Sequence, residues 1–402
     1  MLRNRRPNSD IWYDRGFMRI RTITFIVFLG SFLLSPSRME AGVTCTGDAC
    51  SILPASIQSQ INNLDQALQL QYTDKVLATM SEASVVSNIN SSLMGPGLVN
   101  RFQVGLGVGL AGQQKEDINV VYQNLSFQKL PNVGASVAPN FVVAVNLGWL
   151  MGGGPSDTEP ELKTFLHRFN LYLHGFKFNF SQGDVQKAIE AQNKNVDLGG
   201  DITTGGFTLR YHLIENYSDG IGLFEFSGIS MGLGLHYQRQ AIDVTYNDNK
   251  SQSLTLGPAV GTWGGATTFN YTSTVTSVPI DLRTGFRLFY FFTLFAGGGT
   301  SMNFGSSSLN LSRSGPLVLA LDSSAISASL SPEIAALIPA SALGQTRSGT
   351  LAMDISGKAQ APNTTNFLIA GVEVNALITK ITVEAVVAQN VQSVMVGAKF
   401  TF

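Results

Sequence analysis

The end of the chain alternates apolar and polar residues up to its last position. One face of the strand that this pattern predicts is apolar and carries Val394, Val396, Ala398, Phe400 and Phe402. The opposite face includes Lys399. Terminal residues usually fray in soluble proteins, whereas a membrane barrel needs its last strand to close the sheet with one face in lipid. The ending therefore predicts the closing strand of a membrane β-barrel.

The same alternation recurs along the chain in segments of about ten residues, the length of a membrane-spanning strand. Counting the last one, the predicted strands lie at 100–111, 140–149, 166–180, 207–213, 229–237, 280–290, 291–304, 368–375, 381–387 and 394–402. Further strands within 239–275 and 347–359 would raise the number to about twelve. We predict an all-β transmembrane antiparallel β-barrel of about 10 strands, within a range of 8–14, with a short N-terminal helical segment.

Two features of the predicted strands and loops need a local explanation. The apolar phase of 166–180 changes near Gly175, which predicts a β-bulge. The predicted outer loops are mostly long and rich in Ser, Thr, Asn and Gly, and they lie at 112–135, 181–203, 239–276, 305–364 and 388–392. Within the fourth loop, the apolar stretch 314–346 includes a helix start at Ser331-Pro332-Glu333, and it either folds inward as a plug, presents a contact surface or packs on itself.

The N-terminal part has a different pattern. Arg19 and Arg21 precede an apolar run and a small residue, Ala41, which indicates a signal peptide over 1–41. The true start is then expected at Met18. Residues 42–97 contain an apolar stripe at helical spacing, so we predict a periplasmic or lumen-plugging helical segment. The barrel, with long outer loops, is predicted over 98–402.

The two cysteines of the chain, Cys45 and Cys50, follow the predicted signal directly. In an exported protein such an isolated pair indicates a disulfide bond. The alternative is lipidation of Cys45, although the preceding residues, Ala41 to Thr44, are a poor lipidation motif. Two cysteines and four scattered histidines do not form a zinc ligand set, so no metal is predicted.

Composition and motifs narrow the classes of function. Charged residues make up 13% of the chain against about 25% in soluble domains, and the net charge of −1 gives no indication of nucleic-acid binding. The match of Gly228–Gly232 to G-x-S-x-G lies within a predicted strand rather than at a strand-to-helix elbow. We therefore predict no enzyme, no catalytic residues and no cofactor.

Charged residues on the inward-facing positions are the candidate functional set. They are Arg101, Lys177, Arg210, His212, Asp281, Arg283, Arg287, Glu373, Glu384 and Lys399. Buried charges need partners, and three carboxylates are available for the cations. One interpretation is a salt-bridged lumen that fills a narrow barrel. The other is a basic lining that passes or binds anions.

The last eight residues resemble the signal that the bacterial barrel-insertion machinery recognises. Gly397, Phe400 and Phe402 match that signal, whereas Met395 stands where a polar residue is usual. The exported Cys45–Cys50 motif, the helical stretch and the barrel are together similar to spirochaete surface proteins, including leptospiral surface adhesins that bind laminin or plasminogen. That resemblance implies a protein in the lipid of the bacterial outer membrane whose outer loops bind extracellular, host or matrix molecules.

A second similarity leaves an alternative function open. The helical segment and the apolar loop are also similar to those of fatty-acid-type transporters of hydrophobic substrates. They imply a narrow or plugged channel for small or hydrophobic solutes.

Overall fold

The computed structural model describes residues 42–51, 53, 68–122, 125–130, 132–152, 164–181, 196–218, 223–256, 259–321 and 344–402. The predicted signal peptide at 1–41, residues 54–67 and the predicted helix start at Ser331 lie outside the described residues.

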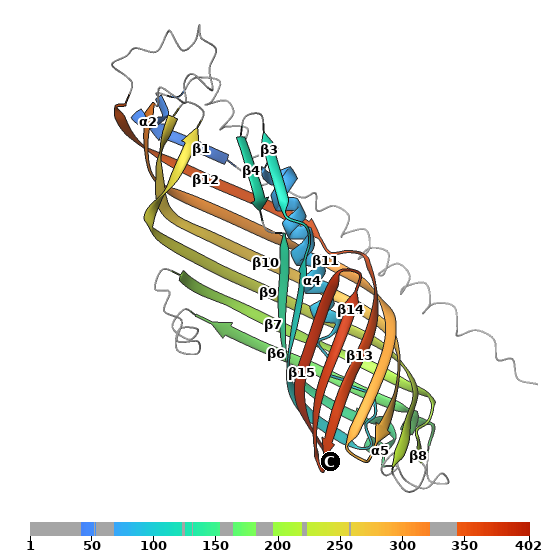
Figure 1. Cartoon of the computed structure of the whole chain (residues 1–402). Coiled ribbons are helices and arrows are strands. Elements are labelled where there is room, and N and C mark those ends of the chain that lie inside the picture. The colour runs from blue at the N-terminus through green and yellow to red at the C-terminus, as the bar shows by residue number, and fades with distance from the viewer. Residues whose placement is uncertain are drawn as a thin grey trace, which may run out of the picture. The chain divides into compact units, whose positions relative to one another are not determined.

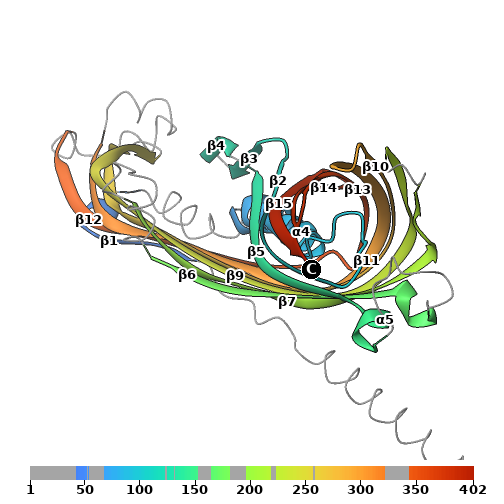
Figure 2. The ribbon, with the colours of Figure 1, turned by 90° about the horizontal axis from the view of Figure 1, so that it is seen from below.

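Ten antiparallel strands of the described chain form a closed ring (Figure 2). They are β2 (Phe102–Gln114), β5 (Val133–Asn146), β6 (Phe169–Phe180), β7 (Val196–Ile214), β9 (Phe224–Leu256), β10 (Ala259–Leu288), β11 (Phe292–Leu321), β13 (Thr364–Ala376), β14 (Thr379–Ala388) and β15 (Val391–Thr401). The ring closes where β15, the last strand, pairs with β2 over Gln392–Thr401. The predicted fold class and its strand number are confirmed, and each predicted strand contributes to one strand of the ring.

The ring is apolar on its outer face, whereas many of its inward-facing side chains are polar. Leu106, Leu233, Val383 and Val396 are 42–58% exposed on its outer face. The intervening positions point inward and are buried although many are polar, as at Thr382 and Ser393. An outward-facing apolar belt is what a barrel needs in lipid.

The ring is about as tall as a membrane. Strand β11 pairs with β13 from Phe292 to Met302, a run that spans about 36 Å at about 3.3 Å per residue. With the tilt of about 45° usual for such strands, this corresponds to the apolar band of about 25 Å seen in outer-membrane barrels.

Three ring strands continue far beyond the ring at one end (Figure 1). Strands β9, β10 and β11 have 33, 30 and 30 residues. The outer half of β11 pairs with β12 (Thr346–Gln360), and β12 pairs with the short β1 (Gly42–Gly47). We call this sheet the extension and this end of the ring the extended end.

The opposite end of the ring carries short connections, and we call it the turn end. A tight turn at Phe289–Phe291 joins β10 to β11, and another at Leu377–Ile378 joins β13 to β14. The backbone N–H of Phe402 donates to the carbonyl of Phe102 at 3.0 Å, so the C-terminus also lies at this end.

The extension corrects three predictions. The segments 239–276 and 305–364, predicted as loops, are largely paired strands. The strand within 347–359 exists as β12 but lies outside the ring. The loop predictions failed because both segments are rich in Ser, Thr and Asn, and a sheet outside lipid does not need a continuous apolar face.

The bulge predicted near Gly175 is wrong. The pairing of β6 with β7 runs from Phe169 to Phe180 without a register shift. Phe176 and Phe178 keep the phase of the inward-facing His174, but they lie beyond Gly175, where the pairing of β6 with β5 ends. The change of pattern therefore marks the ring's rim rather than a change in the backbone.

Short helices and a small hairpin complete the described chain. Near the N-terminus are α2 (Asp48–Ser51), the π-helix η1 (Gln69–Thr73) and α4 (Asp74–Ile89). The remaining elements are β3 (Ile118–Tyr122), β4 (Leu125–Leu130), α5 (Leu147–Leu150), the 3-10 helix η3 (Phe165–Arg168) and β8 (Tyr217–Ser218). None of the helices described is both long and apolar enough to cross a membrane.

Candidate functional site in the barrel lumen

Helix α4 lies inside the curve of the barrel, and its second half, from Ala83 to Ile89, is buried on all sides. Twelve of its 16 residues are buried, and it contacts strands on opposite sides of the ring, among them β5 and β10. Figure 2, a view along the ring, shows α4 within it. The interior next to the helix is mixed: Val86 and Ile89 pack in one apolar cluster with Phe295 and Ile369 of the wall. Other positions of the helix, Thr79, Ser84 and Asn88, are polar and hydrogen-bonded.

The wall makes specific polar contacts with α4. The side-chain amide of Asn88 donates to the carbonyl of His236 at 3.2 Å and to the hydroxyl of Ser277 at 3.0 Å. Gln113 donates to the carbonyl of Thr79 at 2.7 Å. These contacts fix the depth and the rotation of the helix.

After α4, residues 90–101, which we call the threaded segment, pass through the lumen to the start of β2. Non-helical backbone at membrane depth must find its hydrogen-bond partners within the protein. The wall supplies them through side chains that bind the carbonyls of Ser91, Met94, Gly95, Gly97 and Leu98 and the N–H of Gly95. The donors to these carbonyls are, in that order, Asn140, Lys399, Arg283, Asn170 and Gln103.

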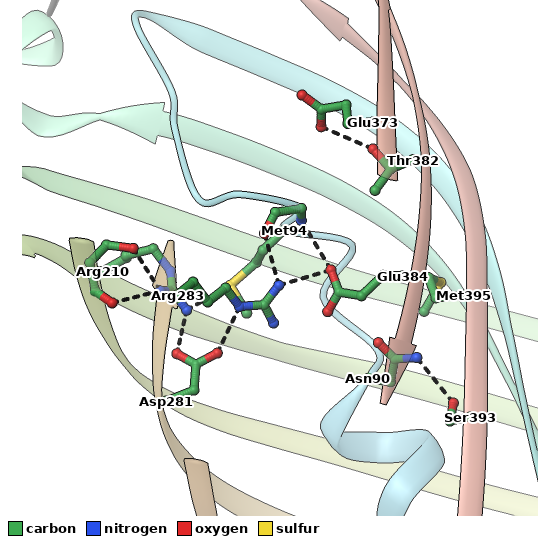
Figure 3. A network of polar contacts seen from close by, with 12 residues as sticks. Asn90, Met94, Arg210, Asp281, Arg283, Glu373, Thr382, Glu384, Ser393 and Met395 are labelled. Carbon is green, nitrogen blue, oxygen red and sulfur yellow. Dashed lines mark hydrogen bonds and ion pairs between the residues drawn. The ribbon is translucent and has the colours of Figure 1, made fainter. Parts of the chain in front are cut away.

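A chain of four buried charges lies beside the threaded segment (Figure 3). Asp281 accepts from both Arg210 and Arg283, and its contact with Arg283 measures 2.8 Å. Arg283 also pairs with Glu384 at 2.8 Å. All four side chains are at most 6% exposed. Arg283 and Glu384 hold the two backbone groups of Gly95, at 2.9 and 3.1 Å, so the ion pair is also a clamp on the peptide.

A second cluster of charges centres on Glu373. It pairs with Lys399 at 2.7 Å and with Lys380 at 3.4 Å, and it accepts from Thr382 at 3.0 Å. Lys399 in turn donates to the carbonyl of Met94 at 3.3 Å. Both clusters therefore reach the threaded segment and join it to strands on different sides of the ring.

Two glycines let the threaded segment approach these charges. Gly95 and Gly97 have φ of +64° and +87°, which other residues rarely adopt. A Cβ on Gly97 would lie 2.6 Å from Cδ of Arg210, and one on Gly95 would lie 2.8 Å from Oε2 of Glu373. Close packing against the wall thus requires glycine at both positions.

The described lumen leaves little free space. A cavity beside Met94, His236, Asp281 and Arg283 has a volume of about 10 Å³, and another beside Leu98, Asn170 and His212 has about 30 Å³. Each has room for only one or a few water molecules. In this conformation, the described part of the barrel is filled rather than open.

The predicted lumen charges are mostly brought together. Seven of the ten are buried in the lumen: Arg210, His212, Asp281, Arg283, Glu373, Glu384 and Lys399. Arg287 is half-buried near the turn end and pairs with Glu225 at 2.7 Å.

Arg101 and Lys177 do not belong to the buried set, because both are exposed. Arg101 precedes the first residue of β2, and Lys177 lies beyond the part of β6 that pairs with β5. At Arg101 the alternation ends before the residue, at the rim of the ring. The prediction for Lys177 depends on the bulge near Gly175; without a bulge, Lys177 has the phase of Leu173, which is 47% exposed on the outer face.

Sequence reasoning missed the polar uncharged residues of the site. Asn140, Asn170 and Gln103 are 1–2% exposed and hold the threaded segment. The sequence places each of these amide side chains at an inward-facing position, but it does not indicate that the backbone of the threaded segment lies opposite them.

The disulfide and the C-terminal strand are also placed. Cys45 and Cys50 form a disulfide at the far part of the extension. Around it, Val43, Leu53, Leu317 and Leu351 form a small apolar core.

In the last strand, Phe400 is 46% exposed on the outer face, and Phe402 lies against Phe102 with ring centroids 6.2 Å apart. The role of Gly397, Phe400 and Phe402 as an assembly signal stays a prediction.

Known structures give a weak likeness. The translocator domain of the autotransporter NalP from Neisseria meningitidis is 9% identical over 75% of this chain and 89% of its own, with a TM-score of 0.32. The outer membrane protease OmpT from Escherichia coli is 10% identical over 75% and 95%, with a TM-score of 0.32. Ail, the attachment invasion locus protein of Yersinia pestis, is 11% identical over 75% and 99%, with a TM-score of 0.20. The fold of this chain is established by its own strand pairings.

The family is clear from the sequence itself. No curated protein matches the chain, but the model of the Lsa36-like family matches residues 38–402, which is nearly the whole chain. The closed ring with its apolar outer belt gives this sequence the form of an outer-membrane barrel. The chain therefore belongs to the Lsa36-like family, a leptospiral surface adhesin-like family, and is a β-barrel protein of the bacterial outer membrane.

Proposed function

We propose that this protein is a surface protein whose extension binds extracellular or host molecules, and that its barrel is an anchor rather than an open channel. The observation that carries this proposal is the occupied lumen: side chains of the wall bind the backbone of the threaded segment at five positions between Ser91 and Leu98. A filled barrel has little capacity for transport, whereas a long sheet beyond the bilayer offers a large surface for binding.

The orientation supports this role. Bacterial barrels have short periplasmic turns and long outer segments, so the extended end should face outward and the turn end should face the periplasm. Phe289, Tyr290 and Phe291 are 52–62% exposed at the turn end, as expected for aromatic residues at the membrane interface.

The extension is suited to polar recognition. Its strands are rich in hydroxyl and amide side chains, and several of these are exposed, as at Thr44, Asn247 and Thr262; such groups bind by hydrogen bonds. Catalysis is a poorer fit, because His174, His236 and Ser230 are at most 6% exposed in the filled lumen.

The binding test removes part of the extension while leaving the ring strands paired. Thr245 of β9 faces Thr268 of β10, so residues 246–267 can be replaced by Asn-Gly, which favours a two-residue hairpin turn. We expect cells that display this variant to bind less laminin and plasminogen than cells with the wild-type protein. The matched control is Ile378→Ser at the turn end, where the side chain is 58% exposed. Equal binding by the trimmed variant and the wild type contradicts the proposal.

The alternative, a plugged channel, has its own measurement. The purified protein in a planar lipid bilayer should show no steady conductance. Steady openings of the wild-type protein would favour the channel and would contradict a permanently occupied lumen.

A further inference from the structure

We infer that the N-terminal end of the exported chain crosses the outer membrane through the barrel's own lumen, so that residues 42–53 lie on the cell surface while Phe402 lies in the periplasm. The inference rests on the proposed orientation, with the extended end outward. It adds a surface element that the loops between strands do not account for.

The path begins at the turn end. Strand β2 starts at Phe102, whose carbonyl accepts from the N–H of Phe402 at 3.0 Å. Arg101, the residue before it, is exposed there. The chain on the N-terminal side of β2 must leave this end either toward the periplasm or up through the lumen.

The contacts show that it goes through the lumen. Leu98 is bonded to Gln103 near the start of β2, and Gly95 is bonded to Glu384 in the middle of β14. Asn90 donates to Ser393 at 3.1 Å, near the end of β15 that is remote from Thr401. Decreasing residue numbers therefore lie at steadily increasing distance from the turn end.

The chain then leaves the ring at the extended end. Leu68 and Leu77 pack with Leu309 and Ile355 in one buried cluster. Leu309 pairs with Gly357 of β12, whereas the pairing of β11 with β13 in the ring ends at Met302. These contacts place η1 and the first turns of α4 against the extension, above the ring.

The disulfide lies farther out still. Cys45 pairs with Leu351, which pairs with Gly315 of β11. Gly315 is 13 residues beyond Met302 along the strand, which is about 43 Å at about 3.3 Å per residue. Even for a strand tilted by about 45°, this exceeds the thickness of the polar headgroup layer on one side of the bilayer. Residues 42–51 and Leu53 are thus well outside the membrane on the side that the extended end faces.

The test uses accessible cysteines in intact cells. In a variant with Cys45→Ser and Cys50→Ser, the protein has no other cysteine, so one can be placed at the exposed Asp48, Gln345 or Ile378. A maleimide on a polyethylene glycol too large to enter porins should label Asp48→Cys and Gln345→Cys in intact cells. Ile378→Cys should be labelled only after the outer membrane is permeabilised.

The outcomes separate the inference from the proposed function. If Gln345→Cys is labelled in intact cells but Asp48→Cys only after permeabilisation, the extension is outside and the threading inference is overturned. If Ile378→Cys alone is labelled in intact cells, the orientation is reversed and the proposed function fails with it. A short epitope inserted between Ala41 and Gly42, with both cysteines retained, should bind antibody on intact cells, and this variant serves if loss of the disulfide prevents folding.

Discussion

Removal of the Glu384 charge should be among the most costly single substitutions in the lumen. Glu384 is 1% exposed, pairs with Arg283 at 2.8 Å and accepts from the N–H of Gly95 at 3.1 Å. In Glu384→Gln the side chain keeps its size and one acceptor, so no cavity is created. Arg283, however, is left to share the single carboxylate of Asp281 with Arg210.

The magnitude follows from the burial of the pair. Removing one partner of a buried ion pair costs about 3–5 kcal/mol, because the other charge stays buried without compensation. Arg283 keeps its contact with Asp281 at 2.8 Å, which places the expected loss near the lower limit of that range. A loss of about 3 kcal/mol lowers the folding equilibrium constant by about a hundredfold.

The assay is urea-induced unfolding of the barrel in phospholipid vesicles, followed by tryptophan fluorescence and by the electrophoretic mobility of the folded form. The control is Asp201→Asn, an equally conservative change in the pair Asp201–Arg239, whose atoms are 2.6 Å apart but whose side chains are 28% and 45% exposed. The control should lose at most about 1 kcal/mol. Equal losses in the two variants would refute the reasoning, because burial is the main difference between the pairs.

Three further predictions concern other parts of the molecule. Gly97→Ala should be less stable than Gly152→Ala by about 1–3 kcal/mol in the same unfolding assay. Both glycines have φ near +86°, but only at Gly97 would the new Cβ overlap the wall, at Arg210. Equal stability would show that the threaded segment moves to accommodate the new Cβ. Cys45→Ser with Cys50→Ser should remove about 2 kcal/mol of loop-closure stabilisation from the far part of the extension alone. Limited proteolysis should then cut the extension while the heat stability of the ring is unchanged. A ring that also becomes less heat-stable would show that the disulfide and the ring belong to one folding unit. Deletion of Phe402 removes the contact with Phe102 and the bond to its carbonyl, and it should lower the amount of protein in the outer membrane fraction, whereas Ile378→Ser at the same end should not; an unchanged amount would count against the terminal residue as an assembly signal.

The ring could be predicted from the sequence because lipid imposes a period on it. Each ring strand must present an apolar residue to lipid at every second position, as Leu233 and Leu235 do on β9. That demand ends at the rim of the membrane. Residues such as Thr267–Thr276 continue the same strands without a continuous apolar face, so they were predicted as loops.

The site was half predictable for a similar reason. Inward-facing charges such as Arg283 and Glu384 follow from the phase of each strand, and charge balance predicts that they pair. Their second role, bonding to the backbone of Gly95, could not be predicted, because backbone groups carry no side-chain signal in a sequence. Gly95 and Gly97 are the sequence feature that indicates a close approach of backbone to the wall, but a Gly-Pro-Gly sequence equally predicts the end of a helix.

The pairing of β15 with β2 has a consequence for biogenesis. The seam joins the first and the last strand of the ring, so it can form only after the chain has been made and delivered to its final residue. Contacts this distant in sequence form late, because the entropy of closing such a loop must be overcome first. Until then the unfinished sheet has an open side through which residues 90–101 can enter sideways, and afterwards the way in is shut. Seam formation therefore encloses the threaded segment, and a chain truncated before β15 lacks the strand that pairs with β2 and leaves the sheet open.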